Sequence, residues 1–77
     1  MADNARSRRT RQQVLDALAD QPRSLGELVA VVGRHRNTVR RHLYQLHAER
    51  LIDLHPAVPA GEAFPTEYFT YTRTSDA

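Results

Sequence analysis

The stretch GRHRNTVRRHLYQLHAERLI, residues 33–52, decides the fold of this chain. Its apolar side chains recur at offsets of four and three, which is the spacing of a buried stripe on an α-helix. The residues of this stripe are Val39, Leu43 and Leu46. Side chains at the same offsets on the opposite side are Asn37, Arg41 and Tyr44. The pattern predicts an amphipathic helix over 36–49, with one face in a core and the other open to a partner.

The outward side of this helix carries the side chains that read base pairs in DNA. Arginine can donate two hydrogen bonds to O6 and N7 of guanine, and asparagine pairs in the same two-pronged way with N6 and N7 of adenine. Tyr44 is expected to be exposed there and to contact a phosphate or a thymine methyl group. The residues expected to contact DNA from this helix and the turn before it are Arg34, Arg36, Asn37, Thr38, Arg40, Arg41 and Tyr44. A solvated polar face without a partner is the alternative.

The composition limits the class of protein. With 77 residues the chain forms one small domain, and without cysteine it has neither disulfides nor a zinc–thiolate site. Its longest apolar run, Leu28–Val32, is too short to cross a bilayer, and the polar N-terminus has no apolar signal region. We therefore expect a cytoplasmic protein without membrane contact.

The positive charge is unevenly distributed along the chain. The formal net charge is only +2, but all 11 basic residues are arginine, and only Arg73 lies beyond Arg50. Arginine suits forked hydrogen bonding to phosphate and guanine. A GC-rich genome, which favours arginine codons, would also explain the absence of lysine.

The N-terminal part is expected to contain a mobile arm and a first helix. Residues 1–9 lack apolar periodicity and predict a disordered basic arm. Thr10–Gln13 has the capping-box pattern and predicts that a helix begins there and runs over about 11–19, up to the break at Gln21-Pro22. Three arginines of the arm and this helix are expected to contact DNA: Arg8, Arg9 and Arg11.

A second capping box, Ser24–Glu27, predicts a short helix over about 25–32. Gly33 is placed to close that helix with positive backbone angles. The arginine-rich helix follows about three residues later, with His35 as its expected N-cap, a weaker capping residue than Ser, Thr, Asp or Asn. Two helices joined by such a turn form a helix-turn-helix unit, whose second helix lies in the major groove of DNA.

The C-terminal part has the composition of a β-hairpin. Its segments are a strand over 51–55 with Ile52 and Leu54 on one face, a proline-rich loop over 56–65 and a strand over 66–72. A frayed tail is expected over 74–77. Two apolar residues of the loop, Val58 and Phe64, are expected either to fold back on the domain or to contact a protein.

Taken together, these residues resemble the winged helix-turn-helix domains of bacterial and archaeal transcriptional regulators, such as the ArsR, MarR and IclR groups. The most telling residues are Asn37–Leu43, Leu46 and Leu51-Ile52, and the resemblance covers about 10–72. It implies an α+β, mainly α fold over 10–73, with three helices followed by a two-stranded β-hairpin wing. It also implies that the third helix reads the major groove and that the wing tip contacts the neighbouring backbone or minor groove.

Two features depart from the family pattern. Arg50 replaces a glycine that often precedes the Leu-Ile pair, so the exit from the recognition helix is expected to lack its left-handed cap. Residues 51–72 contain no arginine or lysine but contain Asp53, Glu62 and Glu67, whereas a wing that grips phosphate normally carries a cation. The acidic wing favours a protein partner over DNA at this surface.

Neither a metal site nor catalysis is indicated. Of the histidines, His42 and His47 are five residues apart and diverge on a helix, and no cysteine completes a tetrahedral set. His42 is expected to hydrogen-bond a neighbouring helix or a phosphate. No nucleophile motif, phosphate-cradling loop or carboxylate pair is present. We expect no metal, no cofactor and no enzymatic activity.

The main hypothesis is sequence-specific binding of double-stranded DNA by a small transcriptional regulator. The first alternative is a winged-helix module that binds another protein within a larger assembly. The second is an architectural protein that binds nucleic acid without sequence preference. The arginine-rich helix favours the main hypothesis, and the acidic wing favours the first alternative. No feature of the sequence indicates an oligomeric state.

Overall fold

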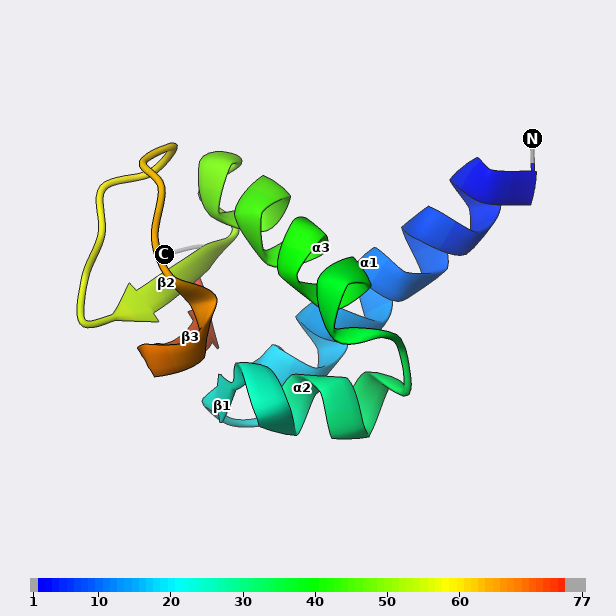
Figure 1. Ribbon diagram of the computed structural model, residues 1–77, viewed down its shortest axis with the longest axis horizontal. Coiled ribbons are helices and arrows are strands. Elements are labelled where there is room, and N and C mark those ends of the chain that lie inside the picture. The colour runs from blue at the N-terminus through cyan, green and yellow to red at the C-terminus, as the bar shows by residue number, and fades with distance from the viewer. Residues whose placement is uncertain (1, 75–77) are drawn as a thin grey trace.

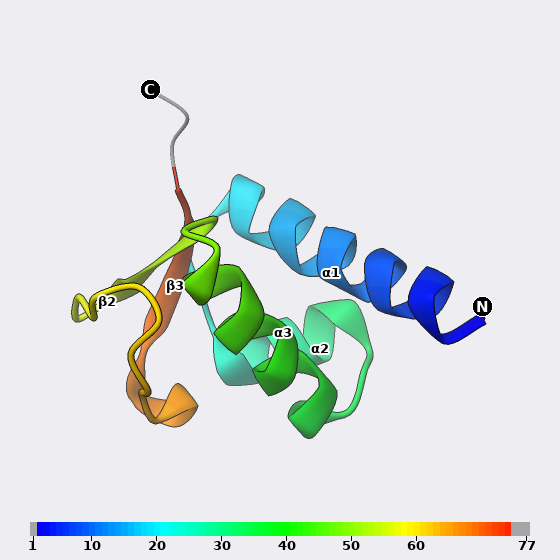
Figure 2. The ribbon, with the colours of Figure 1, turned by 90° about the horizontal axis from the view of Figure 1, so that it is seen from above.

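The structure of the protein is a computed structural model that describes residues 2–74. The fold is α+β and mainly helical, as predicted, and packs three α-helices with a small antiparallel sheet. The elements are α1 (Ala2–Asp20), β1 (Arg23–Ser24), α2 (Leu25–Val32), α3 (Arg36–Ala48), β2 (Ile52–His55), the 3₁₀ helix η1 (Thr66–Tyr68) and β3 (Thr70–Arg73). Figures 1 and 2 show the sheet and its long loop at one end of the molecule and the start of α1 at the other.

The core lies where the three α-helices meet the sheet. The stripe predicted for α3 is fully buried, since Val39, Leu43 and Leu46 are each 0% exposed. In β2 the predicted alternation is confirmed, because Ile52 and Leu54 are buried while the residues between and after them are exposed. Burial of one side of α3 leaves the opposite side, predicted to face a partner, on the surface.

The helix-turn-helix unit has the local interactions that its sequence predicts. Ser24 Oγ accepts a hydrogen bond from the Glu27 amide, and a Glu27 carboxylate oxygen accepts one from the Ser24 amide at 2.8 Å, which completes the capping box. These hydrogen bonds to its charged form lower the pKa of Glu27. Gly33 closes α2 with φ 72°, and His35 Nδ1 accepts a hydrogen bond from the Asn37 amide at the start of α3. The turn therefore holds α2 and α3 in a defined arrangement.

Helix α1 is longer than predicted. It begins at Ala2, so the stretch expected to be a disordered arm is helical from that residue onward, while Met1 lies outside the described residues. Thr10 does not cap a helix; its hydroxyl donates to the Arg6 carbonyl at 3.0 Å, and its side chain is 1% exposed. Threonine in a helix interior often donates a hydrogen bond to the carbonyl four residues back. The Thr10–Gln13 pattern is therefore compatible with a helix interior as well as with a helix start. The N-terminal arginines therefore project from a helix.

The sheet has three strands rather than two. Strand β3 lies in the centre and pairs antiparallel with both β1 and β2, so that Tyr71 stands opposite Arg23 on one side and Leu54 on the other. The strand predicted over 66–72 begins only at Thr70, because residues 66–68 curl into η1. The buried Tyr71 hydroxyl donates to the Thr66 carbonyl at 2.9 Å, which stabilises this curl.

The C-terminal end of the domain is tied to the exit from α3. The Thr74 amide donates to the Leu51 carbonyl at 3.0 Å, so the predicted frayed tail does not include Thr74. The remainder of that predicted tail, residues 75–77, lies outside the described residues.

Helix α3 ends in a left-handed cap made by an arginine. Arg50 has φ 62°, its amide donates to the His47 carbonyl, and the Leu51 amide donates to the Leu46 carbonyl at 2.9 Å. These two hydrogen bonds are those of a Schellman motif, which usually has glycine at the left-handed position. The expectation that this cap is lost without glycine was wrong, because the arginine itself adopts the left-handed conformation.

Replacing Arg50 with glycine is expected to stabilise the domain. A side chain in the left-handed region costs about 1–2 kcal/mol, and the greater freedom of glycine in the unfolded chain offsets part of that gain. We expect Arg50→Gly to raise the free energy of unfolding by about 0.5–1 kcal/mol in urea denaturation. Arg50→Ala is the control, since it removes the same side chain but keeps the strained backbone. Equal stability of the two variants would contradict this reading of the cap.

Candidate nucleic-acid interface

The outward side of α3 carries the polar residues that the sequence predicts there. Arg36, Asn37 and Arg41 are exposed, and Thr38 and Arg40 are half-buried on either side of them. Arg34 lies half-buried in the turn before the helix. Figure 1 shows α3 across the middle of the molecule, between the sheet and the first half of α1. The predicted reading residues are therefore all exposed or half-buried, on α3 and the turn before it.

Arg40 lies on the side of α3 that faces the wing, the segment from β2 to β3. Its Nε is buried and has no hydrogen-bond partner among the residues that the structure describes. Burial raises the pKa of the Tyr71 phenol, and the positive charge of the Arg40 guanidinium opposes this by lowering it. Only part of the Arg40 side chain therefore reaches the outer surface.

Tyr44 connects α3 to the wing. Its side of the helix is exposed as predicted, but the residue is only 37% exposed, and its hydroxyl donates to the Phe64 carbonyl at 2.9 Å. The two rings also pack with their centroids 4.8 Å apart. The hydroxyl, which we expected to contact phosphate, is therefore engaged by the loop that follows β2.

Phe64 is the centre of the contact between the wing and α3. The side chain is 4% exposed and packs against aromatic rings of α3, of β3 and of the residue just before β3. Its ring partners are Tyr44, His47, Phe69 and Tyr71, at centroid distances of 4.8, 4.9, 5.7 and 6.2 Å. Of the two outcomes expected for Val58 and Phe64, the structure has the first, in which the loop folds back on the domain.

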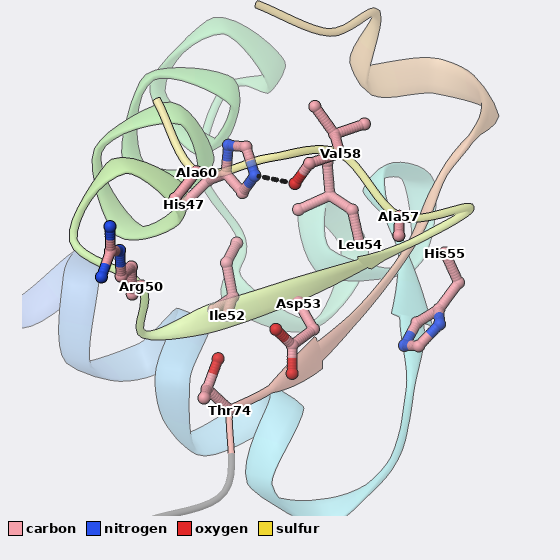
Figure 3. A pocket seen from close by; sticks show the side chains of 10 residues that line it. All are labelled: His47, Arg50, Ile52, Asp53, Leu54, His55, Ala57, Val58, Ala60 and Thr74. Carbon is pink, nitrogen blue, oxygen red and sulfur yellow. Dashed lines mark hydrogen bonds between the residues drawn. The ribbon is translucent and has the colours of Figure 1, made fainter. Parts of the chain in front are cut away.

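The loop after β2 is also held by a buried histidine. His47 is 3% exposed, and its Nε2 lies 2.9 Å from the Val58 carbonyl, so this nitrogen carries the proton and donates. Figure 3 shows the His47 ring pointing to Val58, above a cavity of about 440 Å³ between the loop and β2. Apolar side chains such as Ile52 and Leu54 form part of the cavity wall, so this cavity is less polar than the cationic surface of α3.

The wing places a carboxylate next to the recognition helix. Glu67 in η1 lies 3.6 Å from the guanidinium of Arg36, and the two side chains are 48% and 49% exposed. This ion pair joins the wing to the start of α3. The acidic character that the sequence predicts for the wing therefore acts directly on one of the predicted DNA contacts.

The arginines of α1 are not equivalent. Arg11 forms two hydrogen bonds with the Glu49 carboxylate, one of them at 2.8 Å, and these raise the pKa of Arg11 and lower that of Glu49. Arg11 thus links α1 to the end of α3, in place of the expected free contact to DNA. Arg8 and Arg9 are exposed. The Arg11–Glu49 pair could not be found from local sequence patterns, because its two residues are 38 positions apart.

A helix-turn-helix unit flanked by an antiparallel sheet defines a winged-helix protein. Residues 7–55 match the model of a helix-turn-helix domain family, and the chain belongs to that family. This membership supports DNA binding and a role in transcription regulation, and such DNA-binding families are generally not enzymes. No curated protein and no solved structure matches the chain.

Over residues 2–74, no helix has both the length and the apolar character needed to span a bilayer. Within the same range, no group of three or more metal-ligating side chains comes together.

Proposed function

We propose that the chain binds double-stranded DNA in a sequence-specific manner, as a small transcriptional regulator of the cytoplasm, with α3 in the major groove. One observation carries this proposal: Asn37 and Arg41 are both exposed and lie one turn apart on the outward side of α3. Both belong to the first half of the helix, the part of a recognition helix that contacts base edges. Their residue types are those that pair with adenine and guanine.

Phosphate contacts are assigned to the residues around this pair. Arg8, Arg9 and Arg34 have no ion-pair partner among the described side chains. Thr38, Arg36 and the outer part of Arg40 flank the reading pair on α3. Arg11 is left out, because two hydrogen bonds to Glu49 engage its guanidinium, whereas Arg36 has only the longer contact of 3.6 Å with Glu67. Such contacts position a protein on the duplex without selecting its sequence.

Selection of binding sites from random duplexes, using the purified chain, tests the proposal. We expect one preferred motif, and we expect the binding constant for that motif to fall steeply with salt. Four neutralised phosphates give a slope of about −3.6 on a double-logarithmic plot. Binding without a preferred motif would favour an architectural protein, and a slope near zero would refute DNA binding altogether.

Removing the carboxylate of Glu67 is expected to strengthen DNA binding. Glu67→Gln frees Arg36 and takes a negative charge away from the surface that meets DNA. Exposed ion pairs are worth about 0.2–1 kcal/mol, so we expect the affinity to rise by a factor of about 1.4 to 5 in low salt. Glu62→Gln is the matched control, since Glu62 is an exposed wing carboxylate outside any ion pair of the described residues. An equal rise in both variants would mean that only the net charge matters.

A protein partner bound through the wing is the second candidate. The observation that favours it is Tyr68, which is 82% exposed and follows Glu67 in η1. An exposed aromatic ring beside a carboxylate suits a basic protein surface better than the phosphates of DNA. Under this alternative, the selection experiment yields no motif, and Tyr68→Ala weakens the protein complex.

A further inference from the structure

A polar groove of about 590 Å³ separates the first half of α1 from the flank of α3. Arg6 and Thr10 line it from α1, Arg34 from the turn, and Thr38, Arg41 and His42 from α3. Figure 2 shows the start of α1 extending past the turn between α2 and α3. The groove exists because α1 begins at Ala2, and the disordered arm that the sequence predicts over 1–9 would not form it.

The groove concentrates positive charge that no carboxylate of the described side chains offsets. Three of its residues are the arginines Arg6, Arg34 and Arg41, and no acidic side chain that the structure describes lines it. None of the three arginines is in an ion pair with a described carboxylate, whereas Arg11, Arg23 and Arg36 each are. Guanidinium groups gathered in this way repel one another unless an anion lies between them.

A buried imidazole adds a second, independent observation. His42 is 4% exposed and lines the groove, and its Nδ1 is buried without a hydrogen-bond partner among the described residues. Burial lowers the pKa of His42, and the charges of Arg11 and Arg41 lower it further. A buried polar atom without a partner is rare in proteins and calls for an explanation. Its position beside three arginines indicates a site for an anionic group.

We propose that this groove binds a phosphate group, held by the guanidinium groups of Arg6 and Arg34 beside His42, while the guanidinium of Arg41 at the same groove remains directed to the base edges. Arginine is suited to this role because its planar fork donates paired hydrogen bonds to phosphate oxygens. Arg41 belongs both to the groove and to the outward side of α3, so DNA bound to that side would pass the groove opening. The phosphate is therefore assigned to the DNA backbone, an assignment that rests on the proposed function. A free phosphorylated molecule would offer the same chemistry.

The test compares two variants that lose the same charge. Arg6→Gln removes a groove residue, and Arg73→Gln removes an exposed arginine of β3 that lies outside the groove. Both side chains are exposed, so we expect both variants to fold, and thermal melts check this. With a duplex as ligand, we expect Arg6→Gln to lower the affinity about tenfold and to reduce the salt slope by about 0.9, the effect of one phosphate. Arg73→Gln is expected to change both quantities less.

Inorganic pyrophosphate tests whether the ligand is a free phosphorylated molecule. The NMR resonance of the His42 imidazole reports binding in the groove. One outcome is that pyrophosphate shifts this resonance in the parent chain but not in Arg6→Gln, while both variants bind duplex equally. The groove is then a phosphate site whose ligand is a free molecule. If the parent chain binds no duplex at all, the proposed function fails, and the pyrophosphate titration alone decides the groove. Equal duplex affinity of the two variants, together with an unmoved His42 resonance, would overturn the phosphate site.

Discussion

Phe64→Ala is expected to lower the free energy of unfolding by about 3–5 kcal/mol, the usual cost of deleting a buried phenylalanine ring. The ring is 4% exposed and lies against Tyr44 and His47 of α3 and against Tyr71 of β3. A domain of this length has a total stability of roughly 4–12 kcal/mol, so the loss is a large share of it. Urea denaturation at low temperature measures the change while the variant remains mostly folded.

Two controls define this result. Phe64→Leu keeps most of the buried volume and is expected to cost less than the alanine variant. Tyr68→Ala removes an aromatic ring of the same wing that is 82% exposed, and it should leave the stability nearly unchanged. If Phe64→Ala loses less than about 1 kcal/mol, the loop after β2 does not anchor the wing to α3.

Arg41→Ala is expected to weaken binding to the selected DNA motif by about 1–3 kcal/mol and to relax the preference at one base pair. Arg41 is exposed on the side of α3 opposite the buried stripe, so its removal should leave the thermal melt unchanged. Quantitative binding to the motif and to its single-base variants measures both effects. An equal loss of affinity for every sequence would place Arg41 on phosphate alone, without a role in reading bases.

Leu43→Ala is the matched change on the other side of the same helix. Leu43 is 0% exposed, and removing a buried leucine costs about 2–5 kcal/mol of folding free energy. This variant should therefore lose DNA binding only to the extent that it unfolds. If Arg41→Ala melted the domain while Leu43→Ala left it folded, the outward side of α3 would be wrongly assigned.

The parts of the fold that could be predicted are those coded by neighbours in sequence. Helical periodicity identified the buried side of α3, and the Ser24 capping box and Gly33 marked the two ends of α2. Such features depend on residues three or four positions apart. The threonine pattern at Thr10 failed because a hydroxyl can either cap a helix or bond a carbonyl within one, and packing against the rest of the domain decides between them.

The parts that could not be predicted depend on contacts between distant segments. The strand Arg23–Ser24 has two residues, too few for any periodicity, and it exists because β3 offers it a free edge. For the candidate site, the sequence identified the exposed residues Asn37 and Arg41, but not the ties that engage Arg11 and the hydroxyl of Tyr44. The partners of these two groups, Glu49 and Phe64, lie 38 and 20 residues away.

The recognition helix is fastened to the wing at three places along its length. Arg36 pairs with Glu67 near its start, Tyr44 binds the Phe64 carbonyl further along, and His47 binds the Val58 carbonyl near its end. Attachments spread over a whole helix suppress hinge motion between the two elements. We therefore expect α3 and the wing to move as one unit, so that a partner binding to both must adapt its own shape to them.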